Sequence, residues 1–562
     1  MQRDVDALLE PFDILIVGAG IHGAAIARLT AVAGLKVALI DRDDFCSATS
    51  RNSAKLVHGG LRYIQHLDLA RVRESAVAQR EWRIAAPHLV RPLRFVIPTY
   101  GSGSRGPAAL AAGIAVYEMA TADRNRGVRP SMKLPHARVL GRRHFVGQFP
   151  MLEQPDVSGG AQWHDAQILD APRLTFACIE DARLAGAVVA NHVEALQLLV
   201  VARTVSGAVV RDRLTGREFE IHARLTIDAT GPWSGRLVKM SGVPPRAPPA
   251  RGLTRHVNLV TRRVVTDEVA IGVGSAHASS AVVGASRRLL FISPWQDCSI
   301  VGTWDDPFDG DPDQIGVTPA DVAGWLAEIN EALPSASLCL EDIRSLHVGL
   351  IPATGGSAGR FQRDRLIDHA VSHDLDGLIS VAGVKLTTAP TAARRTLRLA
   401  CRRLGINFDR RHVRFSQPLS GAPESDAPTV AADGPNSERG LDPRTQATAW
   451  VRRVYGSRSD SLLETLPAKD LPVAEHIFRC RVVYGLQHEM VVTLGDAIFR
   501  ATDHAERGVL TDAQLGWAAR TLGDALAWNA SRRATELDDA RTRLAALRPF
   551  VSAHPPASKP IV

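Results

Sequence analysis

A short segment near the N-terminus gathers side chains that could do chemistry. It reads SAKLVHGGLRYIQH over residues 53–66 and contains few residues typical of a core. Arginine suits a phosphate because its planar guanidinium donates two charge-assisted hydrogen bonds at once, and histidine titrates near neutral pH. The spacing alone equally fits a surface arginine beside a core tyrosine, so other segments must decide. The polar side chains around the pair Gly59–Gly60 are those of Lys55, His58, Arg62 and Tyr63.

A glycine-rich loop precedes this segment. Gly18, Gly20 and Gly23 form the pattern GxGxxG between an apolar run at 12–18 and a stretch with helical spacing. The first glycine permits a tight turn, the second lets a diphosphate approach the backbone, and the third allows close packing of helix on strand. A second apolar run ends at Asp41, where an acid can bind a ribose hydroxyl. This βαβ unit predicts dinucleotide binding.

The position of the loop favours FAD over NAD. The loop stands at the start of a chain of 562 residues, and a second glycine element lies far away, within 377–388. A nicotinamide domain needs no such return, whereas an extended flavin dinucleotide is commonly held from both ends of the chain. The strand and turn DATGPWS, residues 228–234, add a third element able to approach the cofactor.

The composition limits the class of protein. Hydrophobic residues make up 45% and charged residues 22%, with a formal net charge of +8, so the chain has substantial cores and an excess of positive charge. Such an excess suits an anionic substrate, an anionic membrane surface or nucleic acid. The basic residues are dispersed and no nucleic-acid motif occurs, so we expect no nucleic-acid partner. The six cysteines form no CxxC pair, which predicts neither a disulfide framework nor a metal site.

The chain is predicted to be an α/β protein, a Rossmann-like FAD-binding domain with an interleaved mixed-sheet substrate domain, followed by an all-α domain. Strand and helix signals alternate through residues 1–415, whereas residues 441–548 show only amphipathic helical spacing. The segment 416–440 has the composition of an exposed linker, and a disordered tail is expected over 549–562. We assign about 10–100, 160–240 and 345–410 to FAD binding and about 100–160 and 240–345 to the substrate domain.

The N-terminus shows no sign of export. It is acidic ahead of its first apolar run and lacks the basic start and cleavage site of a signal peptide. No apolar stretch reaches the roughly 18 residues that would cross a bilayer. We expect a cytoplasmic protein, for which peripheral contact with the inner face of the cytoplasmic membrane stays open.

Several motifs together resemble those of the FAD-dependent glycerol-3-phosphate dehydrogenases, within the D-amino-acid-oxidase-like superfamily. They include DILIVGAGIHGAAIA, ATSRNSAKLVHGGLRYIQH, DATGPWS, FISPWQDCSIVGTWDDPFDGDP and VAGVKLTT, and VVYGLQHEMVVTLGDAIFRAT extends the match into the helical region. The resemblance implies noncovalent FAD and oxidation of the small molecule sn-glycerol 3-phosphate to dihydroxyacetone phosphate by hydride transfer to flavin N5. It also implies that electrons pass to a membrane quinone or another acceptor such as oxygen, and it leaves a homodimer open.

The resemblance assigns five residues to a substrate pocket. Arg62 and Tyr63 match an Arg–Tyr pair that lines it, and Lys385 matches a lysine beside the flavin ring, where a cation stabilises an oxyanion. His256 stands near a histidine of the family pattern and is the candidate general base. Arg363 matches another pocket arginine, in a run RFQRDR whose register leaves its neighbouring arginines as alternatives.

The glycine loop and the resemblance together assign the cofactor-binding residues. The serines and the lysine of residues 49–55 are expected to wrap the flavin and its diphosphate, and backbone amides after Lys385 are expected near the ring. The full set is Gly18, Gly20, Gly23, Asp41, Thr49, Ser50, Ser53, Lys55, His58, Gly59, Val193, Ala229, Gly231, Trp233, Gly383, Lys385, Leu386 and Thr387.

Two positions depart from the family pattern. Where the family usually reads Gly-Val-Arg-Pro-Leu, this chain reads GLIPA over residues 349–353, so Ile351 replaces an arginine of the substrate site. Loss of a charged contact costs about 1.5–3 kcal/mol, roughly one to two decades in affinity, unless Arg255 or Arg360 compensates. The glycine turn GGK has become GVK, with Val384.

These departures keep two other hypotheses open. Ile351 allows a flavin dehydrogenase or oxidase that acts on a different hydroxy compound or an amine. A non-catalytic flavin-binding scaffold would use the helical region as its interaction surface, although the retained Arg62, Tyr63 and Lys385 argue against it. Reduction of the bound flavin by candidate substrates separates these hypotheses.

Overall fold

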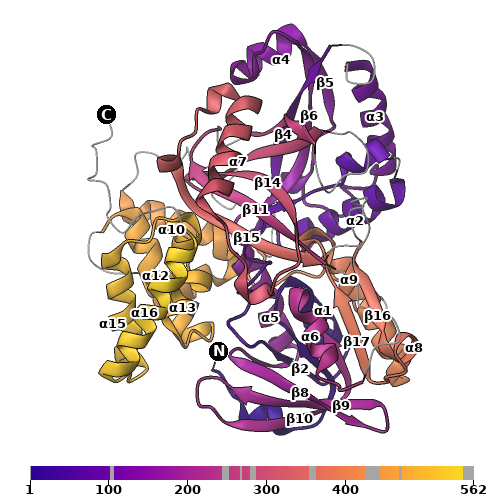
Figure 1. Ribbon diagram of the computed structural model, residues 1–562, viewed down its shortest axis with the longest axis vertical. Helices are drawn as coiled ribbons and strands as arrows, with labels where there is room; N and C mark the ends of the chain where they lie inside the picture. Colours follow the sequence, from indigo (N-terminus) through magenta and orange to yellow (C-terminus); the bar gives the residue numbers. More distant parts are fainter. Residues whose placement is uncertain are drawn as a thin grey trace.

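Two β-sheets and a group of helices make up the protein, seen in a computed structural model (Figure 1). Most of the predicted linker and the whole predicted tail lie outside the described residues. The structure describes residues 2–66, 68–101, 107–243, 252–265, 269–278, 287–352, 363–409, 411–423, 442–466 and 471–548.

The first sheet contains the βαβ unit predicted from the glycine loop. Strand β1 (Phe12–Val17) is an apolar run that is almost wholly buried, and it pairs in parallel with β2 (Val37–Ile40) and β10 (Glu218–Asp228). The alanine-rich helix α1 (Ile21–Val32) packs on this sheet together with α5 (Ala171–Leu184) and α9 (Ala389–Leu404). The strand order is β16-β17-β10-β1-β2-β7, and β9 pairs with both β10 and β8. The strands not yet given are β7 (Val188–Ala190), β8 (Val193–Val201), β9 (Thr204–Asp212), β16 (Arg365–Asp368) and β17 (Leu378–Ala382).

A second, mixed sheet lies above the first in the view of Figure 1. Its order is β15-β11-β14-β13-β12-β4-β6-β3, with β5 beside β6. Alternate residues of its central strands pack into a core under α7 (Pro319–Ala332) and α4 (Arg142–Gln148), which includes Val257, Ile292 and Trp304. The strands are β3 (Leu56–Val57), β4 (Val90–Tyr100), β5 (Arg138–Gly141), β6 (Val157–Ile168), β11 (Leu253–Arg262), β12 (Val269–Ala278), β13 (Arg287–Trp295), β14 (Cys298–Phe308) and β15 (Ile343–Pro352).

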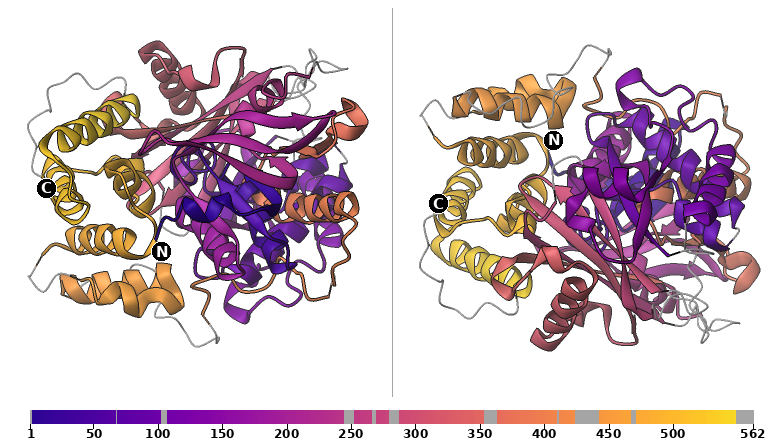
Figure 2. Two further views of the ribbon diagram at one scale, coloured as in Figure 1. Left: turned by 90° about the horizontal axis from the view of Figure 1, so that it is seen from below. Right: turned by 90° about the horizontal axis from the view of Figure 1, so that it is seen from above.

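Residues 442–466 and 471–548 are helical, as predicted, and lie to one side of both sheets (Figure 2). They have a core of their own around Phe478, Leu494 and Leu522. The C-terminal helices are α10 (Pro443–Tyr455), α11 (Ser459–Leu463), α12 (Val473–His488), α13 (Leu494–Asp496), a π-helical turn (Ala497–Ala501), α14 (His504–Arg507), α15 (Asp512–Ala525) and α16 (Ala530–Ala546). The remaining helices are α2 (Leu69–Ala85), α3 (Pro107–Ala120), α6 (Ser234–Lys239) and α8 (His369–Ser372).

The strands cross the limits that the sequence assigns to the two interleaved domains. Strands β3 and β4 belong to the second sheet although they fall within 10–100. Strand β15 also belongs to it, although most of its residues fall within 345–410. The start of the predicted linker is also packed: Leu419 is 2% exposed and its amide donates to the carbonyl of Ala85 at 2.8 Å. The start of the segment with linker-like composition is therefore packed against the rest of the protein.

Within the part of the chain that the structure describes, none of the helices is long and apolar enough to cross a membrane.

Candidate active site

One large cavity, about 1480 Å³ in volume, lies between the two sheets. Its walls on the first sheet are the residues that follow the carboxyl ends of the parallel strands: Gly18 after β1, Asp41 after β2, Ala229 after β10 and Gly383 after β17. Ligands of open parallel sheets bind at this edge. The three glycine elements that the sequence predicts to share a cofactor therefore meet at one cavity.

The turn after β1 has the geometry of a diphosphate cradle. Gly18 has φ +103°, and a Cβ atom there would lie 2.6 Å from the carbonyl oxygen of Ala229. Gly23 packs so closely that a Cβ atom on it would lie 1.8 Å from the carbonyl oxygen of Gly18. The first turn of α1 carries no acidic residue, so the dipole at its N-terminus favours an anion. The amide of Ile21 is held by the hydroxyl of Ser50 at 3.0 Å.

Asp41, the residue predicted to bind a ribose, lines the cavity. Its carboxylate accepts the amide N–H groups of Ala19 at 2.7 Å and Asp43 at 3.0 Å. Burial raises the pKa of Asp41 to about 7, although these two hydrogen bonds lower it in part. The carboxyl group is thus fixed in place and titrates near neutral pH.

We expect FAD affinity to weaken as the pH falls through 7. The ionised carboxylate of Asp41 accepts stronger hydrogen bonds from ribose hydroxyls than the protonated acid does. Because the raised pKa leaves Asp41 mostly protonated at pH 6, FAD should bind roughly tenfold more weakly at about pH 6 than at about pH 8. Titrations followed by flavin fluorescence measure this slope, and Asp41→Asn should flatten it. An equal slope in the variant would contradict the role of Asp41.

The segment after β2 forms a further wall, as predicted. Thr49, Ser50 and Ser53 all line the cavity, and the hydroxyl of Thr49 donates to the carbonyl of Leu350 at 2.8 Å, which joins the segment to β15 of the second sheet. On the other side, Trp233 lines the cavity beneath the Arg42 guanidinium, which lies 4.4 Å from the ring centroid.

Tyr63 and Lys385, both predicted to belong to the substrate pocket, line the cavity and contact each other there. The ammonium of Lys385 donates to the Tyr63 hydroxyl and lies 4.2 Å from the centroid of its ring. Tyr63 is 5% exposed, and the imidazole of His58 contacts its ring edge-on with centroids 5.9 Å apart. Tyr63 reaches the cavity from the 3₁₀ turn Leu61–His66, Lys385 from the turn after β17, and His58 from the residues after β3.

His256 lines the same cavity from β11 of the second sheet. In the ladder it stands opposite Asp305 of β14 and Gly349 of β15. Asp305 is 8% exposed, so a buried carboxylate neighbours His256 in the ladder.

Several predicted residues do not line the cavity. Arg363 is exposed and forms an ion pair with Asp68 at 2.6 Å, so the structure does not support it as a pocket residue. Lys55 is fully buried and points the other way, to Glu506. The side chain of Arg62 lies outside the described part of the structure.

Three further predicted cofactor residues have structural roles. The side chain of Val193 lies in the core beneath the first sheet, and its amide donates to the carbonyl of Asp41 at 2.7 Å, whereas the cavity is lined by the next two residues. Gly59 donates to Asp165 at 2.6 Å and has no room for a Cβ atom, which would lie 2.2 Å from the Tyr117 hydroxyl. Gly23 likewise packs the helix on the strand and does not line the cavity. The other predicted cofactor residues line it, namely Gly18, Gly20, Asp41, Thr49, Ser50, Ser53, His58, Ala229, Gly231, Trp233, Gly383, Lys385, Leu386 and Thr387.

The sequence did not indicate a cluster of aromatic side chains on the cavity wall, here called the aromatic floor. Phe95 stacks on Trp163 with ring centroids 5.4 Å apart and meets Phe291 edge-on at 5.8 Å, and all three line the cavity. Asn258 and Thr303 add polar groups beside His256, and their side chains are hydrogen-bonded at 2.7 Å.

The substituted position forms part of the same wall. Ile351 lines the cavity from β15 and is only partly buried there. The sequence offered Arg255 and Arg360 as residues that could replace the missing charge. Arg255 does not line the cavity, and its guanidinium pairs with Asp306 and Asp321 at 3.4 Å each. Arg360 lies outside the described residues. The wall at Ile351 is therefore aliphatic, and Arg255 does not supply the missing charge.

Comparison with known proteins agrees with this geometry. The family described as FAD dependent oxidoreductase matches residues 13–399. The chain is 29% identical over 506 residues to a glycerol-3-phosphate dehydrogenase of Synechocystis sp., covering 87% of this chain and 88% of the relative. It is 27% identical over 600 residues to the alpha-glycerophosphate oxidase of Enterococcus casseliflavus, covering 94% and 93%.

The fold has a counterpart among solved structures. The glycerol-3-phosphate dehydrogenase of Bacillus halodurans, in complex with FAD, matches 98% of this chain with a TM-score of 0.73 and 23% sequence identity, and 99% of that chain is covered. This likeness extends through the helical region as well as the two sheets. The resemblance drawn from the motifs is confirmed, and the chain belongs to the family of FAD-dependent oxidoreductases.

Proposed function

We propose that the protein oxidises sn-glycerol 3-phosphate to dihydroxyacetone phosphate with FAD as the oxidant. The observation that carries this proposal is that one cavity is lined by the contacting pair Tyr63 and Lys385, by His256, and by a glycine turn with the geometry of a diphosphate cradle. Relatives that align with most of the chain are named for glycerol 3-phosphate. A bound flavin supplies the acceptor for the hydride that leaves the substrate carbon.

The side chains at the substrate end divide the remaining work. His256 takes the proton of the secondary hydroxyl as the C–H bond breaks and the C=O bond forms. The Lys385 ammonium, held by Tyr63, stabilises the negative charge that develops on the substrate oxygen. Arg62, from the same 3₁₀ turn as Tyr63, is the candidate for binding the phosphate.

Anaerobic reduction of the bound flavin tests the proposal. Millimolar sn-glycerol 3-phosphate should bleach the flavin absorbance within seconds, whereas glycerol without the phosphate should act far more slowly. Glycerol alone omits the anion that Arg62 would bind, so it is the matched control. No bleaching by glycerol 3-phosphate would contradict the proposal.

A second candidate is a different hydroxy compound or an amine, and Ile351 is the observation that favours it. Ile351 gives an aliphatic wall at the position where the family pattern has an arginine, and this weakens the binding of an anion. Faster bleaching by another polyol phosphate, hydroxy acid or amino acid in the same assay would support this candidate.

For the electron acceptor we propose a quinone that the enzyme reaches by peripheral contact with a membrane. The net charge of +8 supports attraction to an anionic lipid surface. Reoxidation of the substrate-reduced enzyme should be much faster with a short-chain quinone than with dissolved oxygen, and the reverse order would mark the protein as an oxidase.

A further inference from the structure

The segment from Asp41 to Lys55, here called the cofactor segment, has two sides. Thr49, Ser50 and Ser53 on one side face the cavity. Three charged side chains on the other side, those of Asp44, Arg51 and Lys55, are 6%, 8% and 0% exposed. Buried charges are tolerated only when each is paired, so their partners identify what holds the segment from behind.

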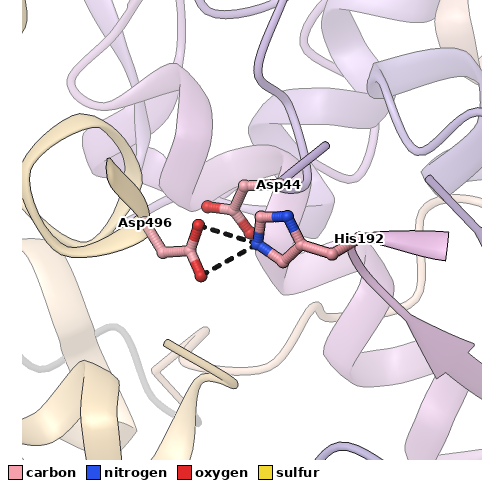
Figure 3. Close-up of side chains that lie close together, drawn as sticks. All are labelled: Asp44, His192 and Asp496. Atoms are coloured by element: carbon pink, nitrogen blue, oxygen red, sulfur yellow. Dashed lines mark hydrogen bonds and ion pairs between the residues drawn. The ribbon is translucent and has the colours of Figure 1, made fainter. Parts of the chain in front are cut away.

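The partners of the first charge come from the helical region. Arg500 donates from Nε to the Asp44 carboxylate at 2.6 Å. Beside this pair, His192 faces Asp496 with Nε2 3.0 Å from the carboxylate (Figure 3), and the His192 amide donates to the carbonyl of Asp43 at 2.9 Å. Burial would raise the pKa of Asp496, but the ion pair with His192 holds it at about 2. One ion pair therefore joins the start of the segment directly to the helical region, and a second joins it through His192.

The geometry of Asp44, His192 and Asp496 would also suit a metal ion. Their oxygens are already engaged: Asn191 and Arg500 donate to Asp44, and the Thr493 hydroxyl and two backbone amides donate to Asp496. A cation would displace these donors and approach the guanidinium of Arg500. The cluster is better described as an ion-pair network.

The other end of the segment is held in the same way. Lys55 has a left-handed backbone, φ +57°, which aims its side chain away from the cavity. Its ammonium donates to Glu506 at 2.7 Å and to the carbonyl of Arg51 at 2.5 Å. Arg51 also approaches Glu506, at 3.7 Å, and its guanidinium lies 4.8 Å from the ring centroid of Phe499.

All of these partners lie between Asp496 and Glu506, a stretch that contains the π-helical turn Ala497–Ala501. We propose that this stretch is a clamp that holds the cofactor segment in its FAD-binding conformation, with Lys55 and Arg500 as positioning residues. The helical region then contributes to FAD affinity although none of its described residues lines the cavity. The proposal is independent of which substrate is oxidised.

Hydrogen exchange of the full chain with and without FAD tests the clamp without any substitution. Because coupling between two sites is reciprocal, FAD should slow amide exchange in residues 494–507 at least threefold. Helix α15, in the same helical region, is the internal control and should be unchanged. Slowing confined to residues 41–58, with no change in residues 494–507, would overturn the proposal.

A pair of variants gives a second test. Glu506→Gln removes one charge of the clamp, and Glu475→Gln removes a charge of α12 whose partners, Arg479 and Gln514, both lie within the helical region. We expect the first to raise the dissociation constant for FAD at least fivefold and the second to leave it within twofold, even where both lower the melting temperature. Equal effects on the dissociation constant would overturn the proposal, and the hydrogen-exchange result decides if Glu506→Gln does not fold.

Discussion

Replacing Gly23 by alanine is expected to strip FAD from the protein. A Cβ atom at this position would lie 1.8 Å from the carbonyl oxygen of Gly18 and 3.0 Å from its carbonyl carbon. The obstacle is backbone, so either α1 moves off the sheet or the turn at Gly18 opens, and both displace the amides that cradle the diphosphate. Overpacking of this kind costs about 1–3 kcal/mol, which corresponds to roughly one to two decades in FAD affinity.

The ratio of flavin to protein absorbance after purification, followed by titration with FAD, measures this effect. Gly324→Ala is the matched control because Gly324 is also a helical glycine, in α7, and a Cβ atom there meets nothing within 4 Å. Alanine stabilises an exposed helix position by about 0.5–1 kcal/mol relative to glycine, so the control should keep its FAD and melt no earlier than the parent protein. Full FAD occupancy in Gly23→Ala would contradict the assigned packing.

The sequence predicts best the parts of the site that depend on backbone geometry. The apolar run of β1, the glycines after it and Asp41 at the end of β2 each have a local physical reason, and the structure brings them together at one edge of a parallel sheet. The family resemblance assigned Tyr63 and Lys385 to the same pocket, and their side chains are in contact although they lie 322 positions apart in the sequence. Such predictions need only strand ends and a shared cofactor.

The direction of individual side chains could not be predicted. Lys55 belongs to the same motif as Ser50 and Ser53, yet a left-handed backbone turns it to Glu506, 451 residues away. Composition gives no signal for such a partner. Gly59 is another example, since the group that excludes a side chain there is the hydroxyl of Tyr117 on α3.

The aromatic floor was missed for a related reason. In strands of the second sheet the two faces alternate, and both carry apolar residues: Val96 and Ile292 pack under the helices, while Phe95 and Phe291 face the cavity. When both faces of a strand are apolar, period-two alternation does not show which face is covered by helices and which borders the cavity. The positions of the covering helices α4 and α7 make this distinction, and they are known only from the structure.

The polar end of the cavity leads to the second large expected effect. Lys385 is the only lysine among the described residues that line the cavity, and Tyr63 holds its ammonium in place. Removing a preorganised donor to a developing oxyanion costs about two to three decades in rate. His58 and His256 also line the cavity, but they approach from other elements and cannot occupy the position of the ammonium above the Tyr63 ring.

Lys385→Met should therefore slow anaerobic reduction of the flavin by glycerol 3-phosphate by about a hundredfold or more while FAD stays bound. Methionine keeps the length and flexibility of the side chain, and the amides of Leu386 and Thr387 remain on the cavity wall, so the cofactor site is preserved. Lys239→Met, at an exposed lysine that ends α6, changes the net charge equally and should leave the rate unaltered. If Lys385→Met kept the parental rate, the reacting carbon would lie at another part of the cavity. If both variants were slowed to the same extent, the cause would be the change in net charge and not the loss of the contact with Tyr63.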